Sequence, residues 1–484
     1  MSIAKKIGIG LIVILVVGAL AGWLLTRPDQ AQLAWAKVTG TDPELTQPRG
    51  ETIPTVRIAE PVGWAAGAAP APAQGLVVNR FAEGLEHPRT VFTLPNGDVL
   101  VALTRAPAIK SPGKENWLVA RVQAFLFSKA GSGGPSPDRI VLLRDADGDG
   151  RAEGRFVLGE QFASPSGMAW ANDVLFVANH DAVWAWPYRL GETALAGSPT
   201  KLMDLAPGGN HWMRGLLLSE DGAKLYVAVG SASNIGERGM AAEDGRALIW
   251  EYDLKTRERR VYGAGLRNAN GMAWNPWSSE LWTVVNERDM LGSDLVPDYF
   301  SNVPVGAQYG WPWVYWKNNI DQRVKSGMPK FMTEYTRRPE YSLGPHVAPL
   351  GLAFSQQGAR LGTRFGQGAF IAQHGSWNRS PPAGYDVVYV PFDARGNPQG
   401  QPVAVLGGFL TGEGTTRGRP TWVSFAKDGA LLVSDDTAGI LWRVIDPKAA
   451  SAPAIERAPR RALPPLKALS GLRGAFGRED YARE

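Results

Sequence analysis

The sequence contains no cysteine, which removes several kinds of chemistry at once. Disulfide bonds, thiolate metal sites, thiol nucleophiles and haem attachment through a Cys-x-x-Cys-His motif are all excluded. Only five histidines occur in the 484 residues. The net charge of +5 is spread along the chain without a long basic run, so nucleic-acid binding is not expected.

Glycine, proline and tryptophan, by contrast, are abundant, with 57, 36 and 18 residues respectively. Glycine and proline supply tight turns, and tryptophan fits the half-buried pleated surface of a strand. The composition therefore indicates a strand-rich fold with many turns.

The N-terminus carries an uncharged apolar run, Ile7–Leu25, which follows Lys5 and Lys6 and ends before Arg27. A helix needs about 20 apolar residues to cross a bilayer, so the run is long enough. The positive-inside rule places the two lysines in the cytoplasm and the rest of the chain outside it. Residues 1–28 are thus predicted to be a single-pass anchor in a bacterial inner membrane, with the rest of the chain in the periplasm. A cleaved signal peptide is the alternative, and it exports the chain as well.

Three further segments follow the apolar run. Residues 29–74 are predicted to be a semi-extended Ala/Pro-rich spacer without a core of its own. Residues 448–484 form a basic Ala/Pro-rich tail, and residues 75–447 carry a weak repeat. Each copy has a small residue and an apolar pair, then a turn, then an alternating apolar stretch. The copies are Pro88–Leu103, Pro165–Asn179, Arg214–Gly230, Asn270–Asn286, Leu350–His374 and Pro420–Asp435.

The repeat predicts an all-β fold, a six-bladed β-propeller over residues 75–447. Each copy is typical of two short strands joined by a tight turn. Hairpins that recur at spacings of about 50 to 80 residues, most with a further strand, are typical of propeller blades. A pair of β-sandwiches is the alternative, but it does not account for the recurrence of one hairpin. The further strands are Val183–Tyr188, Leu248–Tyr252, Asp386–Phe392 and Ile440–Val444.

Polar segments precede three of these hairpins, where the loops of a propeller gather at one end of its channel. His211 lies in a Gly-rich loop, where an imidazole can take a proton from a substrate hydroxyl. Arg267 stands beside two amides and can polarise a carbonyl group. Arg417 and Arg419 point the same way if their segment is extended, and arginine forks suit carboxylates. The alternatives are a histidine bonded to backbone and arginines solvated at the surface.

The segments occur in the order GGNHWMRG, GLRNANG, NERD…DLVPDYF…YGWPW, GPHVAP, HGSWNR and TRGRP. In this order the chain resembles the sugar dehydrogenases that depend on pyrroloquinoline quinone (PQQ), in particular their sorbosone-dehydrogenase-like branch. The resemblance implies a six-bladed propeller enzyme that oxidises an aldose or a sugar-derived aldehyde. It also implies PQQ and Ca²⁺ as cofactors, and a membrane quinone or a cytochrome as electron acceptor.

The resemblance further implies roles for single residues. His211 matches the general base that takes the substrate's proton while hydride passes to PQQ, and Arg267 matches an arginine over the quinone oxygens. Arg379 stands close to the position of a cofactor-binding lysine in the glucose-oxidising relatives. The implied catalytic residues are His211 and Arg267, and the implied cofactor contacts are Arg267, Asn268, Asn270, His346, Arg379, Arg417 and Arg419.

Calcium is implied at two places. The resemblance places an ion that bridges protein and PQQ, largely through backbone carbonyls, near Glu287, Arg288 and Asp289, with Asp294 close by.

The second place follows from the residues themselves. Asp145, Asp147 and Asp149 match the first positions of a calcium loop, but position 12 is Phe156 rather than Glu. A calcium ion there is expected to be structural, and an acidic hairpin turn is the alternative.

Two other functions remain open. A gluconolactonase-like propeller hydrolase uses a channel-bound calcium ion to activate water, and a non-catalytic propeller binds glycans or proteins. The segments at the channel mouth offer mainly arginine, asparagine and histidine, which favours an anionic cofactor.

Overall fold

The computed structural model describes residues 29–51, 54–107, 128–412 and 414–457, together with residues 15–18, 20, 22 and 126. Of the apolar run Ile7–Leu25, only residues 15–18, 20 and 22 are among the described residues. None of the helices in the described ranges is long and apolar enough to cross a membrane.

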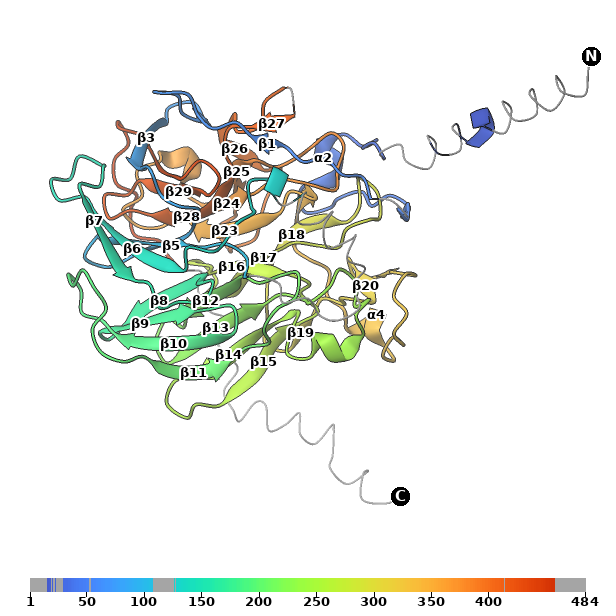
Figure 1. Ribbon diagram of the computed structural model, residues 1–484, viewed down its shortest axis with the longest axis horizontal. Helices are drawn as coiled ribbons and strands as arrows, with labels where there is room; N and C mark the ends of the chain where they lie inside the picture. The colour runs from blue at the N-terminus through green and yellow to red at the C-terminus, as the bar shows by residue number, and fades with distance from the viewer. Residues whose placement is uncertain are drawn as a thin grey trace, which may run out of the picture.

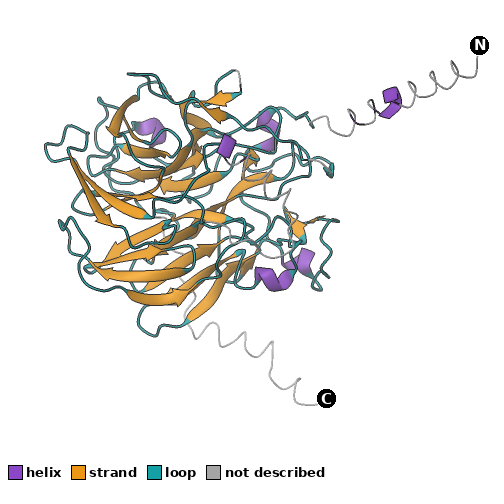
Figure 2. Cartoon of the chain, in the orientation of Figure 1, coloured by secondary structure: helices purple, strands orange, loops and turns teal. Residues whose placement is uncertain are grey.

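Six sheets stand side by side around the centre of the molecule, antiparallel except where β19 (Ala307–Gln308) pairs with β15 (Arg259–Ala264), and strands and loops make up most of the described chain (Figures 1 and 2). All six predicted hairpins are present, and each forms the two inner strands of one blade. The six-bladed propeller is therefore confirmed.

The blades follow one another along the chain, and the strands of each blade run in order from the centre of the molecule outward. Blade 1 has β4 (Pro88–Thr93), β5 (Val99–Leu103), β6 (Arg139–Arg144) and β7 (Gly154–Gly159). Blade 2 has β8 (Gly167–Ala171), β9 (Val174–Ala178), β10 (Ala182–Pro187) and β11 (Thr200–Asp204). Blade 3 has β12 (Arg214–Leu218), β13 (Lys224–Val229), β14 (Leu248–Asp253), β15 (Arg259–Ala264) and the short β19 (Ala307–Gln308).

The remaining blades follow the same plan. Blade 4 has β16 (Ala269–Trp274), β17 (Leu281–Val285), β18 (Pro297–Asn302) and β22 (Tyr341–Pro345). Blade 5 has β23 (Pro349–Phe354), β24 (Gly368–Gln373), β25 (Asp386–Pro391), β26 (Val403–Gly407) and the short β2 (Ala71–Pro72). Blade 6 has β28 (Pro420–Phe425), β29 (Leu431–Asp435), β30 (Ile440–Ile445) and β3 (Val77–Ala82).

Short elements lie outside the blades. They are β1 (Glu60–Pro61) paired with β27 (Thr415–Thr416), β20 (Val314–Tyr315) paired with β21 (Asn319–Ile320), the helices α2 (Trp35–Val38) and α4 (Met332–Tyr335), and the 3₁₀ turns Met240–Glu243 and Thr363–Phe365.

The ring is closed by a strand from the start of the propeller. β3 precedes blade 1 in the sequence but pairs with β30 of blade 6, with Val78 opposite Val444. Without β3, the edge of β30 would present unpaired backbone groups, which invite pairing with another chain. The sequence repeat did not reveal this strand, because β3 lies outside all six hairpins.

The apolar core is divided among the blade interfaces. Within the described residues there are six apolar clusters, and each joins two neighbouring blades. In the cluster between blades 5 and 6, the fully buried Phe370 and Trp442 pack with Val387 and Val433. Burying one such large side chain contributes about 1.5–3 kcal/mol, so neighbouring blades hold one another in place.

Glycines allow the innermost strands to approach closely. A side-chain carbon added at Gly271 of β16 would lie 2.5 Å from the carbonyl oxygen of Leu350 in blade 5. The repeat's small residue therefore makes room for the backbone of the next blade. The glycines in equivalent positions are Gly167, Gly215, Gly271 and Gly351.

Residues 29–74 are not a free spacer. The segment is largely extended, as expected, but it lies on blades 4, 5 and 6. Val38 and Ala59 are buried, and the backbone of Gly40 pairs with Ser342 of β22. The Ala/Pro-rich end adds β2 to the outer edge of blade 5. Of the C-terminal tail, only residues 448–457 are described, and Ala452 bonds to the backbone of blade 5 through Ala359 and Gly358.

The contact at Gly271 yields a prediction about stability. Gly271→Ala should destabilise the protein by about 1–3 kcal/mol or more, because the new methyl group meets backbone that cannot move without shifting β23. Gly327→Ala is the control, since Gly327 is exposed with no atom within 4 Å of the added carbon. Urea unfolding of both variants measures the difference, and equal midpoints would contradict the proposed close packing.

Candidate active site

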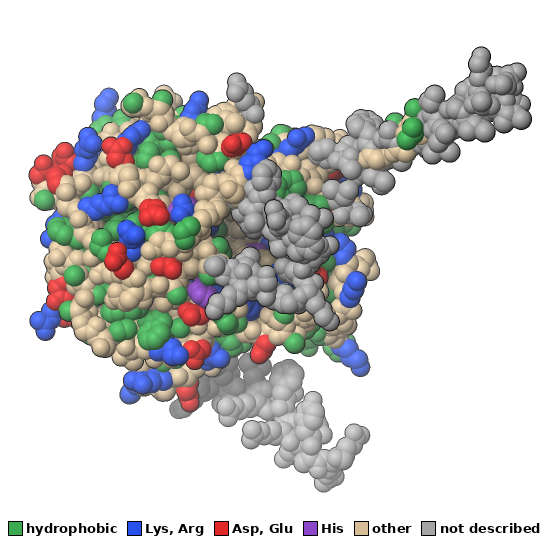
Figure 3. Space-filling model, viewed as in Figure 1, with side chains coloured by type: hydrophobic (Ala, Val, Ile, Leu, Met, Phe, Trp, Pro, Cys, Tyr) green, Lys and Arg blue, Asp and Glu red, His purple; other side chains and the backbone are tan. Residues whose placement is uncertain are grey.

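All five histidines lie at one end of the channel, which we call the histidine end. In each blade the first strand leaves this end and the second strand returns to it, so residues before the first strand and after the second share it. Figure 3 shows histidine and basic side chains near the middle of one face. His87, His211 and His346 precede first strands, and His180 and His374 follow second strands.

A buried ion network joins blades 3, 4 and 5 at this end. Arg267, before β16, donates from Nη2 to the Asp289 carboxylate at 2.9 Å. The other Asp289 oxygen faces His346 Nδ1 at 3.4 Å. Burial works against the charged form of each group. The pKa of Asp289 is nevertheless lowered by Arg267 and His346, and the pKa of His346 is raised by Asp289.

Arg267 already uses its whole guanidinium group within the protein. Besides Asp289, its nitrogens donate to both the backbone and the side-chain oxygen of Asn234 and to the carbonyl oxygens of Asn286 and Glu287. An arginine has five N–H groups, and all five are occupied. Arg267 therefore holds the loops together, and a direct contact with a cofactor would require it to release one of these partners.

His211 is placed to accept a proton. Its Nδ1 donates to the carbonyl oxygen of Ser231 at 2.9 Å, which leaves Nε2 as the unprotonated nitrogen. Burial and the nearby positive charge of Arg267 lower the pKa of His211 to about 3. The imidazole is therefore neutral at neutral pH, and no described residue bonds to Nε2.

A second ion cluster, not predicted from the sequence, joins blades 1, 5 and 6. The Asp436 carboxylate accepts hydrogen bonds from Arg89 Nη1 at 2.5 Å and from His374 Nε2 at 2.9 Å, and His87 Nε2 lies 3.8 Å away. Burial lowers the pKa of both His374 and His87 to about 4. Arg89 also lies 5.6 Å from the Trp212 ring, next to His211 in the sequence. The sequence signal was available, since Arg89 is the second residue of β4 and Asp436 directly follows β29, so the repeat places both residues at the histidine end.

The two arginines of the last predicted segment do not point the same way. Arg419 is buried, and its guanidinium carbon lies 5.1 Å from the Tyr385 ring centre. Its Nε has no partner among the described residues. Arg417 is exposed instead, and its Nη1 donates to the carbonyl oxygen of Gly408 beside Trp64. The segment turns after β27 and is not extended, so only Arg419 reaches the histidine end.

Two amides at the histidine end keep unused acceptors. Asn268 and Asn270 are buried, and neither side-chain oxygen has a hydrogen-bond partner in the described part of the chain. Buried polar atoms without partners are rare in folded proteins. These oxygens are therefore available to a ligand's hydroxyl or amide group.

The residues expected to hold a PQQ-linked calcium ion are engaged with cations. Glu287 accepts a bond from Arg288 Nε at 2.9 Å, and Arg288 is fully buried against Tyr315. A guanidinium has no free electron pair for a metal, so Arg288 cannot serve through its side chain. Asp289 is paired with Arg267 and His346. The carbonyl oxygens of Glu287 and Asp289 also accept hydrogen bonds, from Arg267 and Arg323 respectively, so these groups are not free ligands for a calcium ion.

Arg379 and Asp294 also lie apart from the two ion clusters. Arg379 donates to the carbonyl oxygen of Pro381 and stacks on Trp35 at 5.3 Å. Asp294 Oδ1 is 3.6 Å from Arg379, while Oδ2 accepts the backbone N–H of Gln32 and Leu33. Both residues therefore anchor the segment before the propeller.

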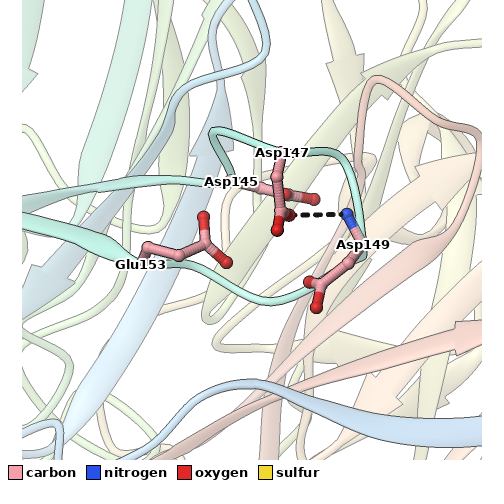
Figure 4. Close-up of side chains that lie close together, drawn as sticks. All are labelled: Asp145, Asp147, Asp149 and Glu153. Carbon is pink, nitrogen blue, oxygen red and sulfur yellow. Dashed lines mark hydrogen bonds between the residues drawn. The ribbon is translucent and has the colours of Figure 1, made fainter.

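The acidic loop of blade 1 brings its carboxylates together (Figure 4). Oxygen atoms of Asp145, Asp147, Asp149 and Glu153 all lie within 4.8 Å of one another. The loop joins β6 to β7, and this turn lies at the end of the blade opposite the histidine end. The group can take a cation, but that ion would be far from the histidines.

The fold and the site together define a six-bladed β-propeller whose channel ends in buried arginine, histidine and carboxylate groups. A family model described as TrAA12-like matches residues 156–304 and 330–448, more than half of the chain. The chain therefore belongs to the TrAA12-like family.

Two curated relatives show how far the similarity reaches. An uncharacterized protein of Borreliella burgdorferi is 30% identical over 300 residues, covering 60% of this chain and 77% of that protein. A "pyrroloquinoline quinone-dependent pyranose dehydrogenase" of Coprinopsis cinerea is 26% identical over 327 residues, covering 55% of this chain and 43% of that protein. The chain thus spans less than half of the pyranose dehydrogenase. The resemblance to PQQ-dependent sugar dehydrogenases is confirmed, and the sorbosone-dehydrogenase-like branch stays a prediction.

Solved structures agree with the fold. The holo form of the pyranose dehydrogenase PQQ domain from Coprinopsis cinerea matches with a TM-score of 0.60 and 21% identity, over 80% of this chain and all of that one. A calcium structure of a Trichoderma reesei family AA12 enzyme matches with a TM-score of 0.62 and 20% identity, over 78% of this chain and 97% of that one. At these identities the matches show the shared fold alone.

The buried histidines yield a prediction about pH. The lowered pKa of His87 means that the unfolded chain binds its proton more tightly, so this residue destabilises the fold as the pH falls from about 6.5 to about 4. His87→Gln should therefore reduce the loss of unfolding free energy between pH 7 and pH 4.5 by about 2.5 kcal/mol. Denaturant unfolding of both proteins at the two pH values measures this. If both proteins lose the same unfolding free energy between the two pH values, protonation of His87 does not destabilise the folded protein.

Proposed function

We propose that this protein is a quinoprotein dehydrogenase that oxidises an aldose or a sugar-derived, sorbosone-like aldehyde with PQQ bound at the histidine end. The observation that supports it most is a pair of buried arginines from neighbouring blades. Arg89 of blade 1 and Arg419 of blade 6 each keep an Nε donor without a partner in the described part of the chain. Family membership and the named PQQ-dependent relatives support the same conclusion.

The residues at the histidine end fit an anionic cofactor. Burial and the positive charge of Arg419 disfavour the charged form of Arg89, and Asp436 is the carboxylate that compensates Arg89 directly. PQQ carries three carboxylates, and charge-assisted hydrogen bonds to arginine are the strongest that such groups form. Bound PQQ supplies the acceptor for two electrons from the sugar. Arg89 and Arg419 would hold its carboxylates, and the oxygens of Asn268 and Asn270 can accept bonds from hydroxyl or N–H groups.

Two histidines can take the proton from the substrate hydroxyl. His211 offers Nε2, because Ser231 accepts the bond from Nδ1. His374 offers Nδ1, because its Nε2 donates to Asp436, which fixes both the tautomer and the ring. The resemblance assigns the role to His211, and an anion beside either ring would raise its pKa toward the range in which a general base is effective.

We assign calcium to the acidic loop rather than to residues 287–289. Four carboxylates that meet without a partner cation among the described residues repel one another, and Ca²⁺ prefers oxygen ligands of this kind. Because the loop lies at the opposite end of blade 1, calcium there would stabilise the β6–β7 turn and take no part in the oxidation.

We also propose that the propeller is exported and held at a bacterial inner membrane, with electrons passing to a membrane quinone or a cytochrome. The apolar run Ile7–Leu25 and the preceding Lys5 and Lys6 support this location. The enzyme's periplasmic placement would give it access to sugars and to quinone in the same membrane.

The arginines offer a matched pair of variants for the cofactor. Arg419→Ala should weaken PQQ binding by about 1.5–3 kcal/mol, or roughly 10- to 150-fold, because it removes a buried charged donor. Arg417→Ala should leave the affinity unchanged, since Arg417 is exposed at Gly408. Titration of the apo-protein with PQQ in the presence of Ca²⁺, followed by dye reduction with aldoses, measures both. Equal affinities of the two variants would remove Arg419 from the cofactor site.

The base is tested by a second pair of variants. His211→Gln and His374→Gln should both fold, and the one that removes the base should lower kcat by about 10²- to 10⁴-fold. PQQ affinity, measured on the same preparations, separates loss of the base from loss of the cofactor. We expect the large loss at His211, with His374→Gln changing kcat less. A larger loss of kcat in His374→Gln than in His211→Gln would assign the role of the base to His374, which is paired with Asp436. Near-normal kcat in both variants would exclude both histidines as the base.

A further inference from the structure

A cavity of about 400 Å³ lies between blades 4 and 5, outward from the channel. Leu343 of β22 lines one side, and the side chains of β24, β25 and β26 line the other. Trp35 of α2 also lines it. The volume falls in the range of about 300–1,000 Å³ that small-molecule sites occupy.

The register of blade 5 turns polar side chains into this cavity. Gln373 ends β24 and Asp386 begins β25, and the two are direct cross-strand neighbours. Val388 follows on the same face, opposite Ala404 of β26. Further along the interface this face is apolar, where Val388 and Ile371 pack with residues of blade 4. At the cavity, Gln373 and Asp386 thus occupy positions on a face that is apolar further along the interface.

Three polar groups at the cavity have atoms without partners. Gln373 is 1% exposed and Arg379 is 4% exposed, yet Gln373 Nε2 and Arg379 Nε form no hydrogen bond in the described structure. Asp386 Oδ1 is likewise unpaired. Leaving a buried polar group unpaired costs about 1–3 kcal/mol. Three such groups around one cavity indicate that a ligand supplies the missing hydrogen bonds.

The chemistry of the three groups selects the ligand. Gln373 and Arg379 offer donors. Burial raises the pKa of Asp386 to about 7, so this group accepts a hydrogen bond when it is ionised and can also donate one when it is neutral. A carboxylate ligand would suit the first two groups and be repelled by the ionised third. Hydroxyl groups both donate and accept, so a polyol satisfies all three. The remaining lining, including Trp35 and Pro402, offers apolar surface for the C–H face of a ring.

We propose that the cavity between blades 4 and 5 binds a neutral sugar of pyranose size, at a site that lies outward from the two ion clusters of the histidine end. This site is independent of the proposed oxidation, because its residues do not belong to either ion cluster. It would hold a sugar, free or at the end of a glycan, without transforming it.

The probe is methyl β-D-glucopyranoside, whose blocked anomeric oxygen prevents oxidation at that carbon. The full chain should bind it saturably, with a Kd on the order of 1 mM, by titration calorimetry or by ligand-observed NMR. Methyl glycosides of other pyranoses and sodium gluconate form the comparison series. Tighter binding of gluconate than of every neutral glycoside would overturn the assignment of a neutral sugar.

Two variants of different kinds place the binding in the cavity. Gln373→Leu removes a donor and should weaken binding about tenfold. Ala404→Trp fills the space while leaving all three polar groups in place, and it should abolish binding. Gln357→Leu is the matched control, since Gln357 is an exposed residue in the β23–β24 turn at the other end of the same blade.

The outcomes separate this site from the oxidation. Ala404→Trp should retain PQQ-dependent dye reduction while losing the glycoside, and thermal melting of each variant confirms that it folds. Binding that survives both Gln373→Leu and Ala404→Trp would place the sugar elsewhere. Absence of saturable binding in the unaltered protein would mean that water alone fills the cavity. Failure of dye reduction in the unaltered protein would count against the oxidation and not against this site.

Discussion

The close packing of six innermost strands around the channel is the constraint on which the rest of the molecule depends. These strands contact one another in a closed ring, from β4 through β8, β12, β16 and β23 to β28 and back to β4. The ring leaves no room for a side chain at positions such as Gly271, where the next strand's backbone is already in contact. β3 comes before blade 1 in the sequence but pairs with β30 of blade 6, so the start of the propeller completes the last blade and closes the ring.

This closure also determines the electrostatics of the histidine end. Every blade begins its first strand there, so charged residues from distant parts of the sequence are buried together. Arg267, Asp289 and His346 form one such group, and Arg89, His374 and Asp436 form the other. Burial disfavours charge, and each group holds its charges only because opposite charges are within a few ångströms. The same burial keeps His211 and His87 neutral.

The segment before the propeller contributes more than a connection. It covers the outer parts of blades 4 and 5, where Trp35 packs against Gly344 and Arg379. Asp294 holds this segment through the backbone of Gln32 and Leu33. Two residues that the family resemblance suggested for cofactor or metal binding, Arg379 and Asp294, are therefore used to attach α2.

The number of blades, and the position of His211 and Arg267 at one end of the channel, could both be predicted from the order of the residues. Six hairpins with the same small residue and turn are a local pattern, and local patterns can be read without knowing what packs against them. The position of His211 and Arg267 before their first strands followed from the same repeat. β3 could not be predicted, because its pairing joins residues more than 350 positions apart, such as Val78 and Val444.

The use of each charged side chain, in contrast, depends on the folded chain as a whole. Arg417 and Arg419 have the same residue type and nearly the same position, yet one is solvated and the other is buried over Tyr385. Glu287 and Arg288 formed a plausible metal segment in the sequence, but they neutralise each other in the core. A side chain's role depends on which atoms of other blades surround it, and this information is absent from the order of residues within one blade.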